Sequence, residues 1–510
     1  MVPAYPNRLF ATFLMMVLFL LLILSVPVWI LFMAVRAGVW LISRVLRPDL
    51  EKFVSGSDSI FAMYDGTRAV TNITTCFITN GHVSCERVQE MFTERVLRAE
   101  WKCGDLYFKR LKQSWTTFLG YPFWRTDVDF DVKNHIRYYD YGGEISLSKE
   151  CSEEDLTRAF VGLSQVPWKK DQSPWEFLVI PGYKSLGYSG PRTAILLRLD
   201  HVLCDAYSII LFLRTLFHSP MKCTTGNLNE RSLSLAKRSG LVFKVVYDLA
   251  DLCLNELDSS QLRSPVISCV KGVDCSISEA VPVDLIKEIK NYYKVSYAAV
   301  IYSVIHGAIQ ATLEKHKELV PKNLATFIIL PKPDRPDKFV NHLYGTCSKL
   351  SCNSNCPQAR LQEIYQKLMK AHSSSTPFGI DLLGSQIQYS PVFLRRFFSH
   401  KLHLVPFGVS VGCTIFPALT GTDFFDGCEV TDLFFGLGPS LNIGIFVAVW
   451  GTNKQQKFVF IVDKTMFRSD KIIQSFGWNV QHQVQLLAKG LNQTGQEPGI
   501  SEDHVEVTVL

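Results

Sequence analysis

A run of 27 residues without a charged side chain, residues 9–35 (LFATFLMMVLFLLLILSVPVWILFMAV), restricts this chain more than any other feature. About 20 apolar residues are enough to cross a bilayer, whereas the apolar part of a cleaved signal peptide holds only about 7–15. The run is apolar on every face, which disfavours an ordinary packed helix of a soluble domain. Residues 1–50 are therefore predicted to form a membrane anchor.

The charges that flank this run predict which side of the membrane holds the rest of the chain. Arg8 and the amino terminus precede the run. Four basic residues follow it: Arg36, Arg44, Arg47 and Lys52. Because cytoplasmic flanks carry the excess of Lys and Arg, we expect the body in the cytosol, at the endoplasmic reticulum or a lipid droplet. Pro27 makes a kinked hairpin in one leaflet an alternative anchor with the same outcome. Two Asn-x-Thr triplets, at Asn72 and Asn492, favour a lumenal body, but the charge asymmetry outweighs them.

The length and the mixture of local patterns predict two lobes. A chain of 510 residues is too long for one ordinary core. Strand-like and helix-like segments alternate in both halves, which indicates an α/β or α+β fold. We expect an N-terminal lobe at 51–220, a crossover helix or linker at 221–275, a C-terminal lobe at 276–490 and a flexible tail at 491–510.

Composition excludes several classes of function. The net charge is +6 without a long basic run, so nucleic-acid binding is not expected. The 14 cysteines are scattered and form no CxxC pair. This usage predicts reduced, mostly buried thiols and no metal site.

Capping and turn signals predict individual elements. A Ser152 cap opens a helix over 152–165. Residues 175–183 and 192–200 are predicted to pair as strands, and Asn80-Gly81 is predicted to be a turn between two further strands. A second hairpin is expected about Thr452–Gln456.

The stretch 194–213, AILLRLDHVLCDAYSIILFL, places Asp200, His201 and Asp205 inside an otherwise apolar segment. A strand precedes the three residues and a helix follows them, so His201 falls at a junction where a side chain can face a cleft. A neutral imidazole can take a proton from an alcohol near pH 7. The acid four residues later can hold the loop by pairing with an arginine elsewhere. Taken alone, the His-x3-Asp pattern also fits a capping or core histidine.

The order of several segments resembles the wax ester synthase/diacylglycerol acyltransferase family, within the CoA-dependent acyltransferases built like chloramphenicol acetyltransferase. The similar segments are GSDSIFAMYD, DVDFDVKNHI with His135, SPWEFLVI with Trp175, LDHVLCDAYS, VSYAAVIYSVIHGAI and the closing hairpin NIGIFVAVWGTNKQQKFVFIVDK. They follow one another in the family's order over most of residues 55–475.

The resemblance implies two similar lobes that meet along a tunnel with His201 at its midpoint. It implies that His201 and Asp205 carry catalysis and that Asp200, Trp175 and His135 contact substrate. Acyl-CoA would be the co-substrate, without a further cofactor or metal. The acceptor would be a lipid alcohol, either a long-chain alcohol or diacylglycerol, and the product a wax ester or triacylglycerol.

Departures from the family pattern keep a second function open. Asp200 replaces the first motif histidine, Ala206 replaces the motif glycine, and Ala298-Ala299 replaces an Asn-Asp pair. The C-lobe segment 413–419 lacks the family's asparagine. An anchored lipid-binding protein of the same fold is therefore the non-enzyme alternative.

Two short motifs suggest further alternatives. Gly408-Val409-Ser410-Val411-Gly412 fits the G-x-S-x-G pattern of serine lipases and esterases, which requires a strand, a sharp turn and a helix. The terminal VTVL resembles a ligand of PDZ domains, although a solvated tail is the simpler and favoured explanation.

Overall fold

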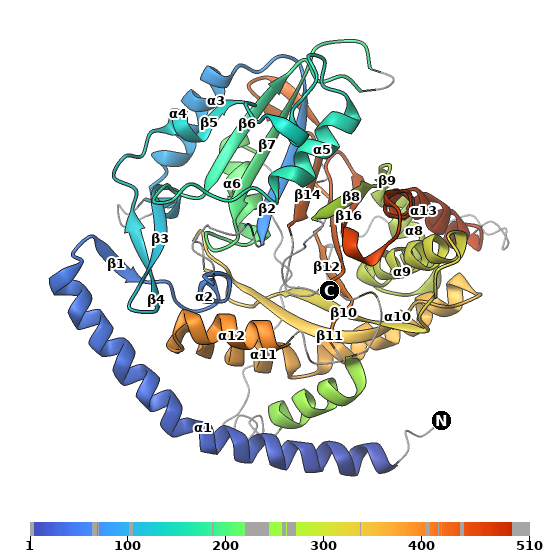
Figure 1. Cartoon of the computed structure of the whole chain (residues 1–510). Coiled ribbons are helices and arrows are strands. Elements are labelled where there is room, and N and C mark those ends of the chain that lie inside the picture. Colours follow the sequence, from blue (N-terminus) through green and yellow to red (C-terminus); the bar gives the residue numbers. More distant parts are fainter. Residues whose placement is uncertain are drawn as a thin grey trace.

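Two mixed sheets, one at the centre of each lobe, organise the molecule (Figure 1). The computed structural model describes residues 5–491 apart from 64–68, 70, 101–105, 186–187, 220–243, 258–261, 263–271, 337, 403–407, 417, 420 and 439–442. Most of the expected crossover at 221–275 and nearly all of the tail, including VTVL, lie outside the described residues.

The N-terminal lobe is built on a six-stranded sheet in the order β13-β14-β2-β7-β6-β5. Its strands are β2 (Asn72–Asn80), β5 (Ile136–Tyr138), β6 (Trp175–Pro181), β7 (Arg192–Asp200), β13 (Phe424–Phe425) and β14 (Cys428–Leu437). Every residue of β7 is buried because helices cover the sheet and strands flank β7 on both sides. The covering helices include α3 (Cys85–Phe92), α5 (Glu153–Leu163) and α6 (Ala206–Phe217).

The C-terminal lobe is built on a seven-stranded sheet in the order β11-β10-β12-β15-β16-β8, with β9 paired to β16. Its strands are β8 (Val273–Ile277), β9 (Val281–Pro282), β10 (Asn323–Pro331), β11 (Leu343–Ser351), β12 (Val411–Ile415), β15 (Ile445–Trp450) and β16 (Gln455–Asp463). The helices α8 (Val283–Tyr293), α9 (Tyr297–Lys315), α10 (Pro357–Ser373) and α13 (Asp470–Ala488) complete the lobe. Helix α9 is apolar around nearly its whole circumference because sheet and helices enclose it.

Strand β14 connects the two lobes. It comes from the C-terminal half of the sequence but pairs antiparallel with β2, with Leu433 opposite Phe77. The two lobes therefore share a sheet, and the N-terminal sheet is complete only when β14 is in place.

A long helix, α1 (Tyr5–Leu46), precedes the body and runs along its lower side in Figure 1. It is continuous through Pro27, so the hairpin alternative is not seen. Its segment Leu9–Leu46 is long and apolar enough to cross a membrane by length and composition. A three-stranded sheet of β1 (Leu50–Phe53), β4 (Tyr121–Thr126) and β3 (Gln113–Phe118) follows it.

Most local predictions are confirmed. Ser152 caps α5 in a full capping box with Asp155, β6 pairs antiparallel with β7, and β15 forms the expected hairpin with β16. The eleven cysteines in the described part of the chain are free.

The prediction of a strand after Asn80-Gly81 is wrong. Gly81 adopts a positive φ of 138° and ends β2, but the chain then enters helix α3. Ser84 caps this helix by accepting a hydrogen bond from the backbone N–H of Arg87. The cap and the helical spacing of buried residues in α3 decide the outcome, and β2 finds its partners in β7 and β14 instead.

Candidate functional site

His201 lies at the junction between β7 and α6, as the sequence predicts. The strand ends at Asp200, and Asp205 begins the helix by accepting a hydrogen bond from the Ser208 N–H at 2.9 Å. The His201 side chain is 8% exposed. Two fixed elements therefore hold the imidazole from either side.

The orientation of the His201 ring follows from its contact with Asn341. Nδ1 of His201 lies 3.0 Å from Oδ1 of Asn341. The amide nitrogen of Asn341 donates to Oδ1 of Asp58 at 2.9 Å and to the His201 carbonyl at 2.8 Å. Because both of those atoms are acceptors, the amide oxygen must face the ring. Nδ1 therefore carries the proton, and the lone pair is on Nε2.

Nε2 of His201 meets no hydrogen-bond partner among the described residues. The ring stacks on Phe61, with centroids 3.9 Å apart and planes 9° from parallel. Burial lowers the pKa of His201 below its ordinary value, which keeps the imidazole neutral near pH 7. The side chain is thus held as a base with Nε2 as its basic atom.

Asp58 and Phe61 come from the short helix α2 (Asp58–Phe61), which lies against the junction. The carboxylate of Asp58 accepts hydrogen bonds from Asn341 and forms an ion pair with Arg110. Arg110 also donates to the Leu203 carbonyl at 2.8 Å. The segment GSDSIFAMYD, found similar to the family by order alone, therefore supplies two groups that contact the His201 network.

Asp205 forms the arginine pair that the sequence predicts. Nη2 and Nη1 of Arg335 lie 2.7 and 2.8 Å from the two carboxylate oxygens of Asp205. The His342 N–H donates to the same carboxylate at 2.8 Å. Both lobes contribute to this pair, since Asp205 follows β7 and Arg335 follows β10. Asp205 acts on the ring's position rather than by direct contact with the imidazole.

Asp200 neither faces solvent nor bonds to the His201 ring. Its carboxylate accepts the Val202 N–H at 2.9 Å and the side chain of Trp115. Burial raises the pKa of Asp200 to about 7. The residue that replaces the family's first motif histidine thus fixes the backbone of the His201 loop.

His135 and Trp175 lie together inside the N-terminal lobe. Each is 1% exposed, and their rings stack with centroids 4.5 Å apart. Nδ1 of His135 pairs with the Trp175 carbonyl at 2.8 Å, and the indole of Trp175 donates to the Leu111 carbonyl at 2.7 Å. Packing accounts for both side chains, and the geometry gives no support to the predicted substrate contact.

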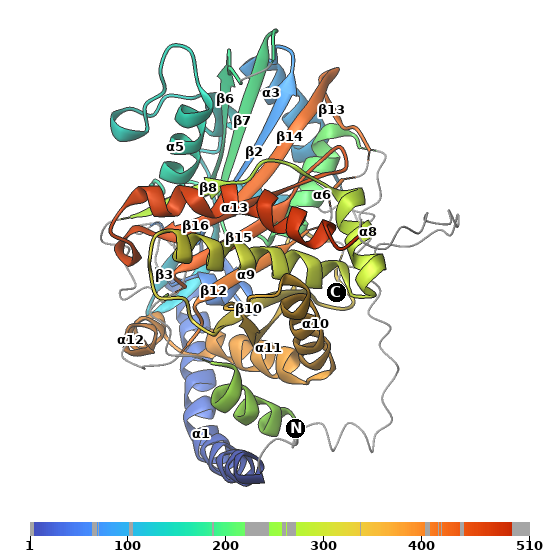
Figure 2. The ribbon, with the colours of Figure 1, turned by 90° about the vertical axis from the view of Figure 1, so that its right-hand side faces the viewer.

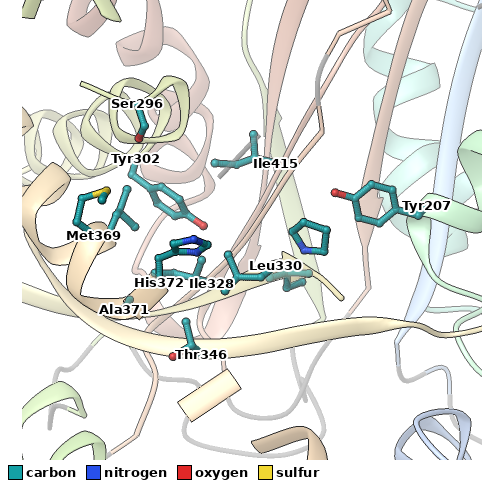
Figure 3. A pocket seen from close by; sticks show the side chains of 13 residues that line it. Tyr207, Ser296, Tyr302, Ile328, Leu330, Thr346, Met369, Ala371, His372 and Ile415 are labelled. Atoms are coloured by element: carbon teal, nitrogen blue, oxygen red, sulfur yellow. The ribbon is translucent and has the colours of Figure 1, made fainter. Parts of the chain in front are cut away.

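One cavity in the C-terminal lobe opens near the junction (Figure 3). It is small, with a volume of about 30 Å³. Its wall is mainly apolar, from β10, β12 and α10, and the Tyr207 hydroxyl from α6 points toward it. His201 is not among its lining residues, so this cavity is not the predicted tunnel with His201 at its midpoint.

The lipase alternative is wrong. Ser410 is fully buried and is followed directly by strand β12, where a nucleophile elbow requires a helix. Among the described residues, no group of three or more His, Cys, Asp or Glu side chains is arranged to hold a metal ion.

Four residues that complete the His201 network were not predicted from the sequence: Asp58, Phe61, Arg335 and Asn341. Arg335 and Asn341 lie in the polar segment 332–342 between β10 and β11. Polar residues clustered after a buried strand were the only available signal.

Residues 54–231 match the family model described as the wax ester synthase/diacylglycerol acyltransferase catalytic domain. This range includes His201 and Asp205. The predicted resemblance to this family is therefore confirmed. A comparison with curated protein sequences finds no match.

Solved structures share the fold over nearly the whole body. The wax ester synthase/diacylglycerol acyltransferase from Marinobacter aquaeolei VT8 is 12% identical, with a TM-score of 0.58 over 87% of this chain and 100% of its own. The trichothecene 15-O-acetyltransferase TRI3 from Fusarium sporotrichioides is 10% identical, with a TM-score of 0.57 over 85% and 95%. A mutant starter condensation domain of rhizomide synthetase, in complex with C8-CoA and Leu-SNAC, is 11% identical with a TM-score of 0.55 over 88% and 96%. The predicted two-lobed α/β fold is confirmed.

Proposed function

We propose that this chain is a membrane-bound O-acyltransferase that moves a fatty acyl group from acyl-CoA to a lipid alcohol. The family match over residues 54–231 and the fold support an acyltransferase. The acceptor is a long-chain alcohol or diacylglycerol, and the product a wax ester or triacylglycerol.

The protonation of His201 is the observation that carries the proposal. Asn341 accepts the Nδ1–H, so Nε2 is the basic atom, and burial keeps the ring neutral. A general base needs both properties near pH 7. Asp58 in turn holds the amide that fixes this tautomer.

The chemistry follows from that single base. Nε2 takes the proton of the acceptor hydroxyl while its oxygen attacks the thioester carbonyl. The tetrahedral intermediate collapses by breaking the carbon–sulfur bond, and the imidazolium returns the proton to the leaving thiolate. The step is balanced without a covalent acyl-enzyme, a metal or a redox partner. General-base assistance of this kind contributes about 10²–10⁴-fold.

The cavity beside Tyr207 has a mainly apolar lining, of the kind that a lipid chain of this reaction requires. Its polar groups are few, including the hydroxyls of Tyr302 and Thr346. The neighbour bound to C8-CoA supports acyl-CoA as the donor. We place the body on the cytosolic side of the endoplasmic reticulum or a lipid droplet, with α1 as its anchor, because acyl-CoA and bilayer-soluble alcohols meet at that surface.

A second function, lipid binding without turnover, is favoured by one observation. The His201 ring lies under Phe61 and outside the cavity wall. A protein with this geometry and with the departures at Asp200, Ala206 and Ala298-Ala299 binds an apolar chain but gives an acceptor hydroxyl no path to Nε2.

Transfer from labelled acyl-CoA in membranes of expressing cells separates the two functions. We expect ester product with hexadecanol or diacylglycerol, and a loss of about 10²–10⁴-fold in His201→Ala at equal expression. His482→Ala, an exposed histidine on α13, is the matched control and should keep full activity. Full activity in His201→Ala contradicts the mechanism. Retention of labelled alcohol without any product supports the binding protein.

A further inference from the structure

Helices α11 (Thr376–Gln386) and α12 (Val392–Leu402) expose only apolar side chains among those that the structure describes. Phe393 alone is 64% exposed. The exposed side chains of the two helices are Phe378, Leu382, Leu383, Phe393, Phe397 and Phe398. A helix that faces water carries charged residues on its outer side. The outer sides of α11 and α12 therefore lack the charged residues that a water-facing helix carries.

The two arginines of α12 point the opposite way. Arg395 donates to the Ser59 carbonyl at 3.0 Å and to the carbonyls of Gln388 and Ser390. Arg396 donates to the Met63 carbonyl. In α10, by contrast, the charged side chains of Glu363 and Lys370 are exposed, while Leu361 and Ile364 are buried together with Arg360. α12 thus keeps its arginines inside and its phenylalanines outside.

The apolar surface extends beyond the two helices. The tip of the β3–β4 hairpin joins it, since the Val392 N–H donates to the Gly120 carbonyl at 2.8 Å and the neighbouring Leu119 is exposed. We call the six side chains above, together with Leu119, the α11–α12 face. Scattered exposed apolar residues need no explanation, but a contiguous set marks a docking surface.

Helix α1 is attached beside this face. The Arg36 guanidinium donates to the carbonyl of Gln388, in the turn η5 (Ile387–Tyr389) between α11 and α12. It also stacks over Phe53 at 4.1 Å. Figures 1 and 2 show α1, α11 and α12 on the same lower side of the body. The apolar surfaces of α1 and of the α11–α12 face are thus on one side of the molecule.

We propose that the α11–α12 face docks on the lipid bilayer that holds α1, as a second membrane contact of the body. The inference rests on the proposed membrane location of α1. The face would insert into the apolar layer beneath the lipid headgroups, where aromatic and leucine side chains of interfacial helices are buried.

One short helix, α2, lies between the α11–α12 face and His201. Arg395 of α12 holds the carbonyl of Ser59 in α2, and Phe61 of the same short helix covers the imidazole. Gly384 of α11 lies close to the side chain of Ile60, also in α2. A lipid alcohol that leaves the bilayer at this face therefore reaches α2 first.

Photocrosslinking of the full chain in nanodiscs tests the proposal without any need for catalysis. The nanodiscs contain phosphatidylcholine with a tritiated acyl chain, and p-benzoylphenylalanine replaces Leu382, Phe393 or Phe397 in turn. Trp478, 69% exposed on α13, is the matched position away from the face. Leu24, 63% exposed on α1, reports the anchor. We expect lipid labelling at the three face positions at least tenfold above Trp478 and similar to Leu24.

The remaining outcomes each overturn the docking. Labelling at the Trp478 level from all three face positions, with strong labelling from Leu24, rejects the face but leaves the anchor. Background labelling from Leu24 as well rejects both. Crosslinks from the face to a second copy of the chain, rather than to lipid, make it a dimer interface.

Discussion

His201 in the N-terminal lobe and His306 in the C-terminal lobe are both buried, and the two sites differ in how the ring is held. His201 sits where a strand meets a helix, with Nδ1 bonded to an amide oxygen and Nε2 without a partner among the described residues. His306 sits in the middle of α9, with Nε2 paired to the Thr326 hydroxyl at 3.1 Å. Its Nδ1 is buried and has no hydrogen-bond partner among the described residues.

A buried and neutral imidazole ring is therefore not sufficient to make a histidine a general base. Burial lowers the pKa of both rings, that of His306 to about 3. What separates them is the position of the nitrogen without a partner. In His306 it faces a packed core, whereas His201 directly follows the end of a strand, beside α2 and the loop after β10.

The largest expected difference between the two sites is in the stability that one arginine contributes to each. Arg335 pairs with the Asp205 carboxylate, whereas Arg360 bonds to the side-chain oxygens of Gln310 and Gln483, at 2.8 and 2.6 Å. Removal of a partner from a buried ion pair costs about 3–5 kcal/mol. Loss of bonds to neutral amides costs about 1–3 kcal/mol. We expect Arg335→Met to lower the free energy of unfolding by the larger amount and Arg360→Met by the smaller, measured by urea unfolding in detergent.

Equal losses in the two variants would contradict this distinction. Asp205→Asn in the Arg335→Met background serves as the control, because it removes the unpaired charge and should restore part of the stability.

The pH dependence of stability tests whether the buried ring of His306 resists protonation. His306 has a folded pKa of about 3, well below the ordinary histidine value, so the unfolded chain binds the proton more tightly. Stability contributed by the neutral ring is present above pH 6.5 and is lost as the pH falls toward 3. At pH 5 the loss amounts to about 2 kcal/mol, at about 1.4 kcal/mol per pKa unit. Between pH 7 and pH 5 we therefore expect the free energy of unfolding to fall by about 2 kcal/mol less in His306→Leu than in the unchanged protein.

The measurement is the unfolding free energy at the two pH values, with His482→Leu as an exposed control. An unchanged pH dependence in His306→Leu would mean that the buried ring does not resist protonation as its surroundings imply.

The smallest expected effect concerns the bond that fixes the His201 tautomer. Asn341→Leu leaves Nδ1 without its acceptor, which costs about one hydrogen bond, or about tenfold in kcat. KM should change less than twofold, because Asn341 lies on the Nδ1 side of the ring, away from the basic atom. A purely structural role would lower the amount of folded protein and leave kcat per folded molecule unchanged.

Local signals predicted most of the elements but not their partners. The Ser152 capping box and the β15–β16 hairpin are decided within a few residues, and both were found from sequence. The pairing of β14 with β2 joins residues more than 340 positions apart, as in Leu433 opposite Phe77. No local pattern carries that information.

The site residues also divide into those that a local stretch predicts and those that only tertiary packing brings in. His201, Asp205 and the strand–helix junction were predicted from one continuous stretch. Phe61, Asp58, Arg335 and Asn341 reach it from α2 and from the loop after β10, and only tertiary packing brings them together. Trp175 and His135 are buried and stacked on each other, and their contact with substrate stays a prediction.

The strand shared between lobes also sets an order of events during synthesis. When β2 and β7 leave the ribosome, one edge of β2 still lacks β14, and at about 5–20 residues per second the missing strand arrives roughly 10–50 seconds later. During that interval the nascent chain presents an open, apolar strand edge while α1 is already available to the membrane. Chaperone occupancy of ribosome-bound chains should therefore persist until residue 437 has emerged, and a truncation before β14 should aggregate rather than yield half a protein.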